Sequence, residues 1–352
     1  MNSTQIETDR FGCTSEGKSV GRFTLRGPNG MMVRLIDFGA TVTELQVPDC
    51  DGRIADVVLG FDDLASYETK SPYFGSTVGR AAFRIPYGRF ELDGRSYQLD
   101  ANGGPHHIHG GTKGFSWVVW DAEPLERDDG PAVRFTYHSP DGDQGYPGAV
   151  DAEAVYALTD AGELRIEFTA TCDRPTPIDM THHGYFNLAG AGVGDVNDHV
   201  VEIAADFYSE TDDQVIATGA LLPVERTPLD FTEPKRIGER LAMLPEQTGG
   251  YDLAYLNRNQ SGTVALVASV HEPTTGRTMH VLTDAPALIF YGGNYLDGTL
   301  RGKGGVAYEK HSGLAMETAA LPDAVNHANF PSIILRPGET YRRTCIYRFA
   351  AE

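Results

Sequence analysis

Residues 152–170, AEAVYALTDAGELRIEFTA, decide the fold because apolar and polar side chains alternate on both sides of a short turn. The turn is Asp160-Ala161-Gly162, whose residue types favour a chain reversal. A period of two residues is typical of half-buried strands, whereas an amphipathic helix repeats about every 3.6 residues. We therefore expect an antiparallel hairpin with these apolar residues on one face: Ala152, Ala154, Tyr156 and Leu158 before the turn, and Leu164, Ile166, Phe168 and Ala170 after it.

The same alternation continues outward from this hairpin in both directions. Further turns are expected at Asp93-Gly94, between Phe90/Leu92 and Tyr97/Leu99; at Pro28-Asn29-Gly30, between Phe23/Leu25 and Val33/Leu35; and at residues 336–339, between Ile333/Leu335 and Cys345/Tyr347/Phe349. Only residues 234–244 have helical spacing. Because no linker or change of composition interrupts the pattern, we expect one all-β domain over residues 1–352. A large antiparallel β-sandwich is favoured over a barrel.

Composition narrows the class of partner. The 352 residues carry a formal net charge of −20, and the acidic residues are scattered rather than collected in one block. Such a charge repels nucleic acid and anionic lipid, and no apolar stretch approaches the roughly 18 to 20 residues of a membrane span. The four cysteines form no CxxC pair, and residues 1–10 lack the apolar core of a secretory signal. We expect a cytoplasmic protein that binds neither nucleic acid nor membrane.

Five polar clusters interrupt the strand pattern and are candidates for one shared site. They are rich in Gly, Pro or His and lie far apart in the chain, as expected of loops that converge in space. The clusters are residues 77–80, 104–111, 181–188, 250–252, and 316–318 followed by 322–324.

The histidines in these clusters first suggest a metal. His107 and His109 have the spacing of a cupin site, but Gly110 and Gly111 follow where a cupin needs a glutamate, and no HExxH motif occurs. A GxSxG nucleophile and a GxGxxG nucleotide loop are also missing from the sequence. The pattern therefore favours acid–base chemistry by histidine and carboxylate, with no metal or cofactor.

Four of the motifs resemble those of the aldose 1-epimerase (galactose mutarotase) family, and the likeness runs from about Val33 to the C-terminus. The motifs are His109-Gly110-Gly111, similar to LHGG; residues 183–188, HGYFNL, similar to NHxYFNL; Glu317-Thr318 with Pro322-Asp323-Ala324 and Asn326, similar to LETQ…PDAPN; and residues 141–148, similar to DGxxGYPG. The resemblance implies a large antiparallel β-sandwich and a small-molecule sugar substrate.

The resemblance also implies roles for individual residues. Glu317 matches the family's general base and His183 its general acid, while Arg80, His109 and Asp252 match positions that bind the sugar. Tyr185 is a further candidate, since an aromatic ring can stack on a sugar face. The chain is expected to act as a monomer or homodimer.

Several positions depart from the family pattern. Phe83 stands where the family has asparagine, Ile289 where it has glutamine, and His182 where it has the asparagine before the acid histidine. We therefore expect Phe83 and Ile289 to alter sugar recognition, so that a deoxy sugar, a pentose, a ketose or an oligosaccharide end replaces galactose. Besides a mutarotase, two alternatives remain: a non-catalytic carbohydrate-binding module, or an acid–base enzyme acting on a larger glycoside.

Overall fold

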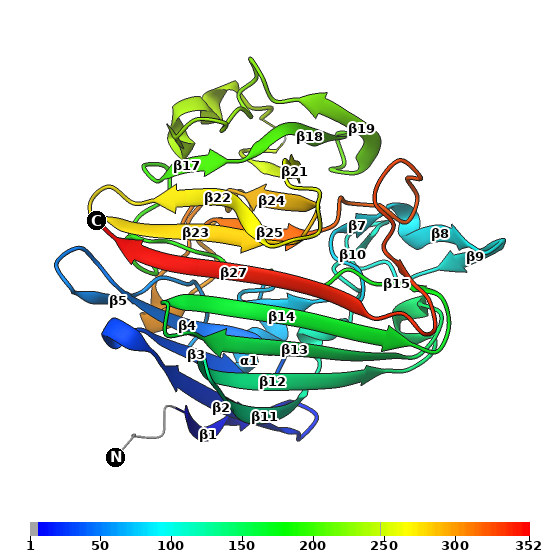
Figure 1. Cartoon of the computed structure of the whole chain (residues 1–352), viewed down its shortest axis with the longest axis horizontal. Helices are drawn as coiled ribbons and strands as arrows, with labels where there is room; N and C mark the ends of the chain where they lie inside the picture. The colour runs from blue at the N-terminus through cyan, green and yellow to red at the C-terminus, as the bar shows by residue number, and fades with distance from the viewer. Residues whose placement is uncertain (1–5, 247) are drawn as a thin grey trace.

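The computed structural model describes residues 6–246 and 248–352, and strands dominate it (Figure 1). In these residues the largest antiparallel sheet has nine strands. Their order is β11 (Asp121–Arg127), β12 (Gly130–Ser139), β13 (Val150–Leu158), β14 (Glu163–Cys172), β27 (Tyr341–Ala351), β23 (Arg277–Thr283), β22 (Ala265–His271), β17 (Val200–Ile203) and β20 (Lys235–Arg236). The long strand β27 thus lies in the middle of the sheet (Figure 1).

Two five-stranded sheets complete the larger part of the described structure. The first has the order β1 (Ile6–Cys13), β2 (Ser19–Arg26), β3 (Met32–Ile36), β4 (Thr41–Pro48) and β5 (Ile54–Asp56). The second, which we call the site sheet, has the order β19 (Ala217–Pro223), β18 (Ala205–Thr211), β21 (Asp252–Asn257), β24 (Ala287–Tyr291) and β25 (Ala315–Ala319). Short antiparallel pairs join β6 (Ser76–Val78) to β16 (Thr181–His183), β7 (Arg84–Ile85) to β10 (His107–Ile108), β8 (Arg89–Leu92) to β9 (Arg95–Gln98), and β15 (Thr176–Pro177) to β26 (Ile334–Leu335).

The all-β fold and the register of the deciding hairpin are confirmed. Strands β13 and β14 pair Ala154 with Phe168 and Tyr156 with Ile166, as the alternation predicts. The turn at Asp93-Gly94 likewise joins β8 to β9.

The predicted helical segment is present as a 3₁₀-helix over Ile237–Met243. Helix α1 (Leu64–Lys70) was not predicted; its N-terminus is capped by the Asp63 carboxylate accepting from Ser66 N–H at 2.8 Å. The turn at residues 336–339 is present, with Glu339 N–H donating to the Arg336 carbonyl at 3.0 Å, but the strands on its two sides do not pair with each other, because β26 pairs with β15 while β27 pairs with β14 and β23. In the part of the chain that is described, no helix is long and apolar enough to cross a membrane.

Apolar residues from all three large sheets share one core. Leu35 of the first sheet, Phe168 of the nine-stranded sheet and Phe290 of the site sheet are fully or almost fully buried in it. Because side chains alternate along a strand, every second residue of the site sheet points away from this core, to the opposite face of the sheet. The expectation of a single domain over residues 1–352 stays a prediction, and residues 1–5 and 247 lie outside those described.

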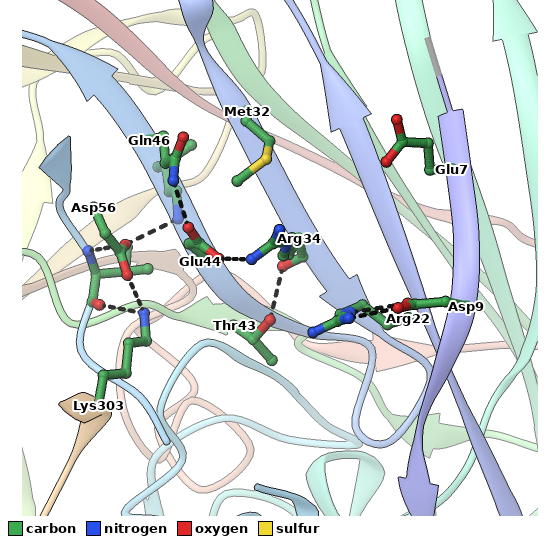
Figure 2. A network of polar contacts seen from close by, with 12 residues as sticks. Glu7, Asp9, Arg22, Met32, Arg34, Thr43, Glu44, Gln46, Asp56 and Lys303 are labelled. Atoms are coloured by element: carbon green, nitrogen blue, oxygen red, sulfur yellow. Dashed lines mark hydrogen bonds and ion pairs between the residues drawn. The ribbon is translucent and has the colours of Figure 1, made fainter. Parts of the chain in front are cut away.

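Polar contacts fasten one distant loop to the first sheet (Figure 2). Asp56 accepts from Leu45 N–H at 3.0 Å and from the Lys303 ammonium at 2.5 Å, and Lys303 also donates to the Val58 carbonyl at 2.8 Å. Lys303 ends the loop that contains Leu300, a residue that lines the cavity described below. The ion pair therefore holds one side of that cavity in place.

Candidate active site

The register of the site sheet brings two carboxylates to one face. Asp252 of β21 lies opposite Tyr291 of β24, and Ile289 of β24 lies opposite Glu317 of β25. Met316 enters the shared core, so the alternation of β25 turns Glu317 to the other face. Asp252 and Glu317 thus project from the same side of the sheet.

His183 approaches Glu317 from the short strand β16. Its Nε2 lies 3.6 Å from Glu317 Oε1, and the two residues are 5% and 2% exposed. Glu317 Oε2 and His183 Nδ1 are buried and have no hydrogen-bond partner among the described residues. The predicted acid and base are therefore brought together, with an oxygen and a nitrogen still unpaired.

Two tyrosine rings enclose the His183 imidazole. Tyr185 stacks on it with ring centroids 5.0 Å apart and planes inclined by 13°. Tyr73 lies nearly parallel to it with centroids 5.8 Å apart and planes inclined by 18°. This sandwich fixes the imidazole plane and thereby the direction of Nε2.

A cavity of about 200 Å³ opens above the pair. Pockets for drug-sized ligands measure about 300–1000 Å³, so this cavity suits a single small ring. It is lined by Pro72, Tyr73, Phe83, Arg84, Ile108, His109, His183, Tyr185, Asp252, Tyr291, Tyr295, Leu296, Leu300 and Glu317. Six of the predicted site residues are in this lining, and Ile289 lies buried behind it, in an apolar cluster against which Phe83 packs.

Arg80 does not reach the cavity, contrary to the sequence-based expectation. Its guanidinium is 2% exposed and donates to Ser139 Oγ and to the carbonyls of Ser139, Pro140, Pro147 and Gly148 at 2.8–3.1 Å. All five N–H donors of an arginine are thereby occupied. Arg80 holds loops together and has no donor left for a sugar.

Arg84, four residues later, is the arginine that lines the cavity, and sequence reasoning missed it. Strand β7 pairs Arg84 with Ile108, and the neighbouring Ile85 is buried, so alternation turns Arg84 the other way. Its charge opposes the effect of burial, which raises the pKa of Asp252. In the sequence, the apolar residue Ile85 next to Arg84 was the one local indication that Arg84 faces the other way.

His109 is held at the cavity by an unusual backbone. Its φ is 49°, and a side chain at the next position, Gly110, would lie 1.6 Å from the Gly79 carbonyl oxygen, so only glycine fits there. His109 Nδ1 accepts from Phe83 N–H at 3.3 Å, and its ring centroid lies 5.2 Å from that of His183.

The other histidines of the motifs have structural partners. His107 bonds the Asp100 carbonyl and the Tyr146 hydroxyl, each at 2.7 Å. His182 points away from the cavity into the core, where Nδ1 lies 3.3 Å from the Tyr156 hydroxyl. Residues 6–246 and 248–352 contain no group of three or more His, Cys, Asp or Glu side chains arranged to hold a metal.

Burial sets the protonation of the central pair. It raises the pKa of Glu317 well above its usual range, assisted by the negative charges of Asp252 and Asp179. Burial also lowers the pKa of His183 to about 4, and that of His109 well below its usual value. Both shifts favour the uncharged forms in the empty cavity, a protonated Glu317 beside a neutral His183.

A pair with one proton is a bifunctional catalyst. Whichever group carries the proton is an acid, and its partner is a base, at a distance that lets both contact one small substrate. Asp252 and Arg84 offer an acceptor and a planar fork of donors nearby. The arrangement thus suits concerted proton transfer on a polyhydroxylated ring.

Known proteins match this chain over almost all of its length. The family model of aldose 1-epimerases matches residues 21–348. Galactose mutarotase of Rattus norvegicus is 44% identical over 336 residues, 96% of each chain. Aldose 1-epimerase of Escherichia coli (strain K12) is 36% identical over 341 residues, which is 96% of this chain and 97% of that protein.

Solved structures show the same fold. An aldose epimerase homologue from C. elegans superposes with a TM-score of 0.86 at 31% identity, covering 93% of this chain and 98% of that one. A galactose 1-epimerase from Lactobacillus acidophilus also gives 0.86, at 27% identity and 99% coverage of both chains. Given the full-length sequence match and the shared fold, this chain belongs to the aldose 1-epimerase family.

Proposed function

We propose that this chain is a mutarotase, an isomerase that interconverts the α and β anomers of a free sugar. The observation that carries the proposal is the pair His183 and Glu317, buried 3.6 Å apart at the base of a cavity the size of one ring. Relatives named galactose mutarotase and aldose 1-epimerase support the same activity.

The reaction needs two proton transfers at neighbouring oxygens. Glu317 takes the proton of the C1 hydroxyl while His183 protonates the ring oxygen, and the C1–O bond of the ring breaks to leave an aldehyde. Rotation about C1–C2 presents the other carbonyl face. The same two groups then exchange roles as the ring closes.

In the empty cavity the pKa of Glu317 is raised and that of His183 is lowered, yet the reaction uses Glu317 as the base and His183 as the acid. One proton shared by the pair explains both. A protonated Glu317 beside a neutral His183 carries the same charge and the same one proton as carboxylate beside imidazolium. Moving the proton across the pair as the sugar binds therefore needs no exchange with solvent. The sugar oxygens then stabilise the ion pair by hydrogen bonding to both members.

The remaining polar groups of the cavity bind the sugar in this proposal. Asp252 accepts from ring hydroxyls, and Arg84 and His109 donate to or accept from others. Tyr185 and Phe83 present ring faces or edges to the sugar, with Ile289 supporting Phe83 from behind. Ring opening and closing by these groups calls for no cofactor.

Polarimetry on freshly dissolved α-anomers tests the activity directly. We expect faster mutarotation of at least one sugar among glucose, galactose, xylose, arabinose, fucose and fructose. Glu317→Gln and His183→Asn should each lower kcat by about 10²–10⁴-fold while the fold, followed by circular dichroism, is kept. Full activity of Glu317→Gln would remove the assigned base.

Two alternatives have distinct outcomes in the same assay. A non-catalytic carbohydrate-binding module would bind sugar in calorimetry without accelerating mutarotation. An enzyme acting on a larger glycoside would release a product from an oligosaccharide, whereas a cavity of about 200 Å³ suits a single ring. The cytoplasmic location and the monomeric or homodimeric state stay predictions, for cell fractionation and light scattering to test.

A further inference from the structure

An apolar cluster forms one side of the catalytic position. We call it the apolar wall and define it by Phe83, Ala254, Ala287, Ile289, Ala319 and Leu321. Phe83 is the member that lines the cavity, and the others are at most 3% exposed. None of these side chains has a hydrogen-bond donor or acceptor.

Glu317 lies on the border between this wall and the polar half of the cavity. Ile289 is directly opposite Glu317 in the β24/β25 ladder, and Ala319 follows Glu317 on the same face. On the side of Glu317 away from the wall, Tyr185 packs on Tyr291 with ring centroids 5.8 Å apart, and His183 stacks on Tyr185. The order across the site is therefore His183, Glu317, apolar wall.

The order of atoms in an aldose ring matches this order of side chains. With the ring oxygen at His183 and the C1 hydroxyl at Glu317, the next ring atom is C2, and it faces the wall. A hydroxyl packed on these side chains gives up its water and gains no hydrogen bond from them, since none of them carries a donor or an acceptor. A hydrogen atom at C2 packs against the wall at no such cost.

We propose that the substrate is a 2-deoxyaldose, a sugar with hydrogen in place of the C2 hydroxyl. The proposal rests on the mutarotase function above and names the substrate class of that site. An apolar pocket rejects an added hydroxyl by up to about 10²-fold, so kcat/KM for a 2-deoxy sugar should exceed that for its parent by about tenfold to a hundredfold.

The first experiment uses the unmodified protein. Polarimetry, corrected for the uncatalysed rate of each sugar, compares 2-deoxyglucose with glucose, 2-deoxygalactose with galactose, and fucose, a 6-deoxy sugar, with the others. A preference of about tenfold or more for both 2-deoxy sugars is expected. Equal or better rates with the parents, or a preference for fucose alone, overturn the inference and leave the mutarotase function intact; no acceleration of any sugar overturns both.

A substitution in the wall tests the cause of the preference. Phe83 has a φ of 64°, a backbone conformation that asparagine adopts more readily than phenylalanine, so Phe83→Asn fits the backbone and adds an amide. It should lower the 2-deoxy to parent ratio of kcat/KM by about tenfold or more. Tyr87→Asn is the matched control, because Tyr87 has a φ of 53°, is 56% exposed and lies outside the cavity. An unchanged ratio in a folded Phe83→Asn protein contradicts the role of the wall.

Discussion

Replacing Arg80 by lysine separates a structural arginine from a substrate-binding one. The guanidinium makes five hydrogen bonds of 2.8–3.1 Å, and lysine has only three N–H donors, so at least two acceptors lose their partner. A buried group left unpaired costs about 1–3 kcal/mol. Arg80→Lys should therefore lower the free energy of unfolding by about 2–6 kcal/mol, a large part of the about 5–15 kcal/mol of a typical domain.

Urea unfolding followed by the fluorescence of Trp117 and Trp120 measures this loss. Arg84→Lys is the control: it should leave the free energy of unfolding within about 0.5 kcal/mol and raise KM, because Arg84 lines the cavity. Ser139→Ala removes one partner of Arg80 and gives a smaller loss of about 1–3 kcal/mol if Arg80→Lys does not fold. Wild-type stability with a raised KM in Arg80→Lys would refute this account and return Arg80 to the sugar site.

Three further predictions concern the acid–base pair, the Tyr185 ring and the ion pair between Lys303 and Asp56. Because the pair must hold one proton, kcat/KM should rise with pH through the lowered His183 pKa of the empty cavity, about 4; a rising limb at the ordinary histidine pKa of 6.5 in the profile of kcat/KM against pH would contradict this. Tyr185→Leu removes one face of the imidazole sandwich and a ring that lines the cavity, so it should lower kcat about tenfold and also raise KM, whereas Tyr185→Phe should keep both; equal kcat in the two variants would exclude the positioning role. Lys303→Met leaves Asp56 without its cation and should cost about 1–3 kcal/mol in thermal unfolding, and an unchanged melting temperature would show that the loop needs no anchor.

The sequence predicted those parts of the fold that depend on local periodicity. Tyr156 and Ile166 pair as expected because the turn between them and the alternation around it specify one register. Helix α1 was missed because it is one short element of seven residues, too brief for a helical period to stand out. The pairing of β26 with β15 was not predicted, because it is a long-range choice that no turn specifies.

Site residues could be predicted from the sequence where they stand in a unique motif, but not where two residues of the same type lie close together in the chain. Glu317, His183 and His109 each stand in a distinctive motif, Asp252 was identified from its position in the family pattern, and all four line the cavity. Arg80 and Arg84, four positions apart, are both candidates for binding the sugar. Which of them does so depends on which guanidinium is bound to carbonyls elsewhere in the chain, and here that is Arg80. The protonation of the pair was also beyond the sequence, since burial by distant segments sets it.

The two-residue alternation of β25 has an evolutionary consequence. Inserting or deleting one residue within this strand would exchange the two faces, sending Glu317 into the core and a neighbour such as Met316 or Thr318 into the cavity. Substitutions at Phe83 or Ile289, by contrast, leave the ladder untouched. New sugar preferences in this lineage are therefore expected to arise by replacing side chains around an unchanged strand length, while changes in length are confined to loops outside the site sheet.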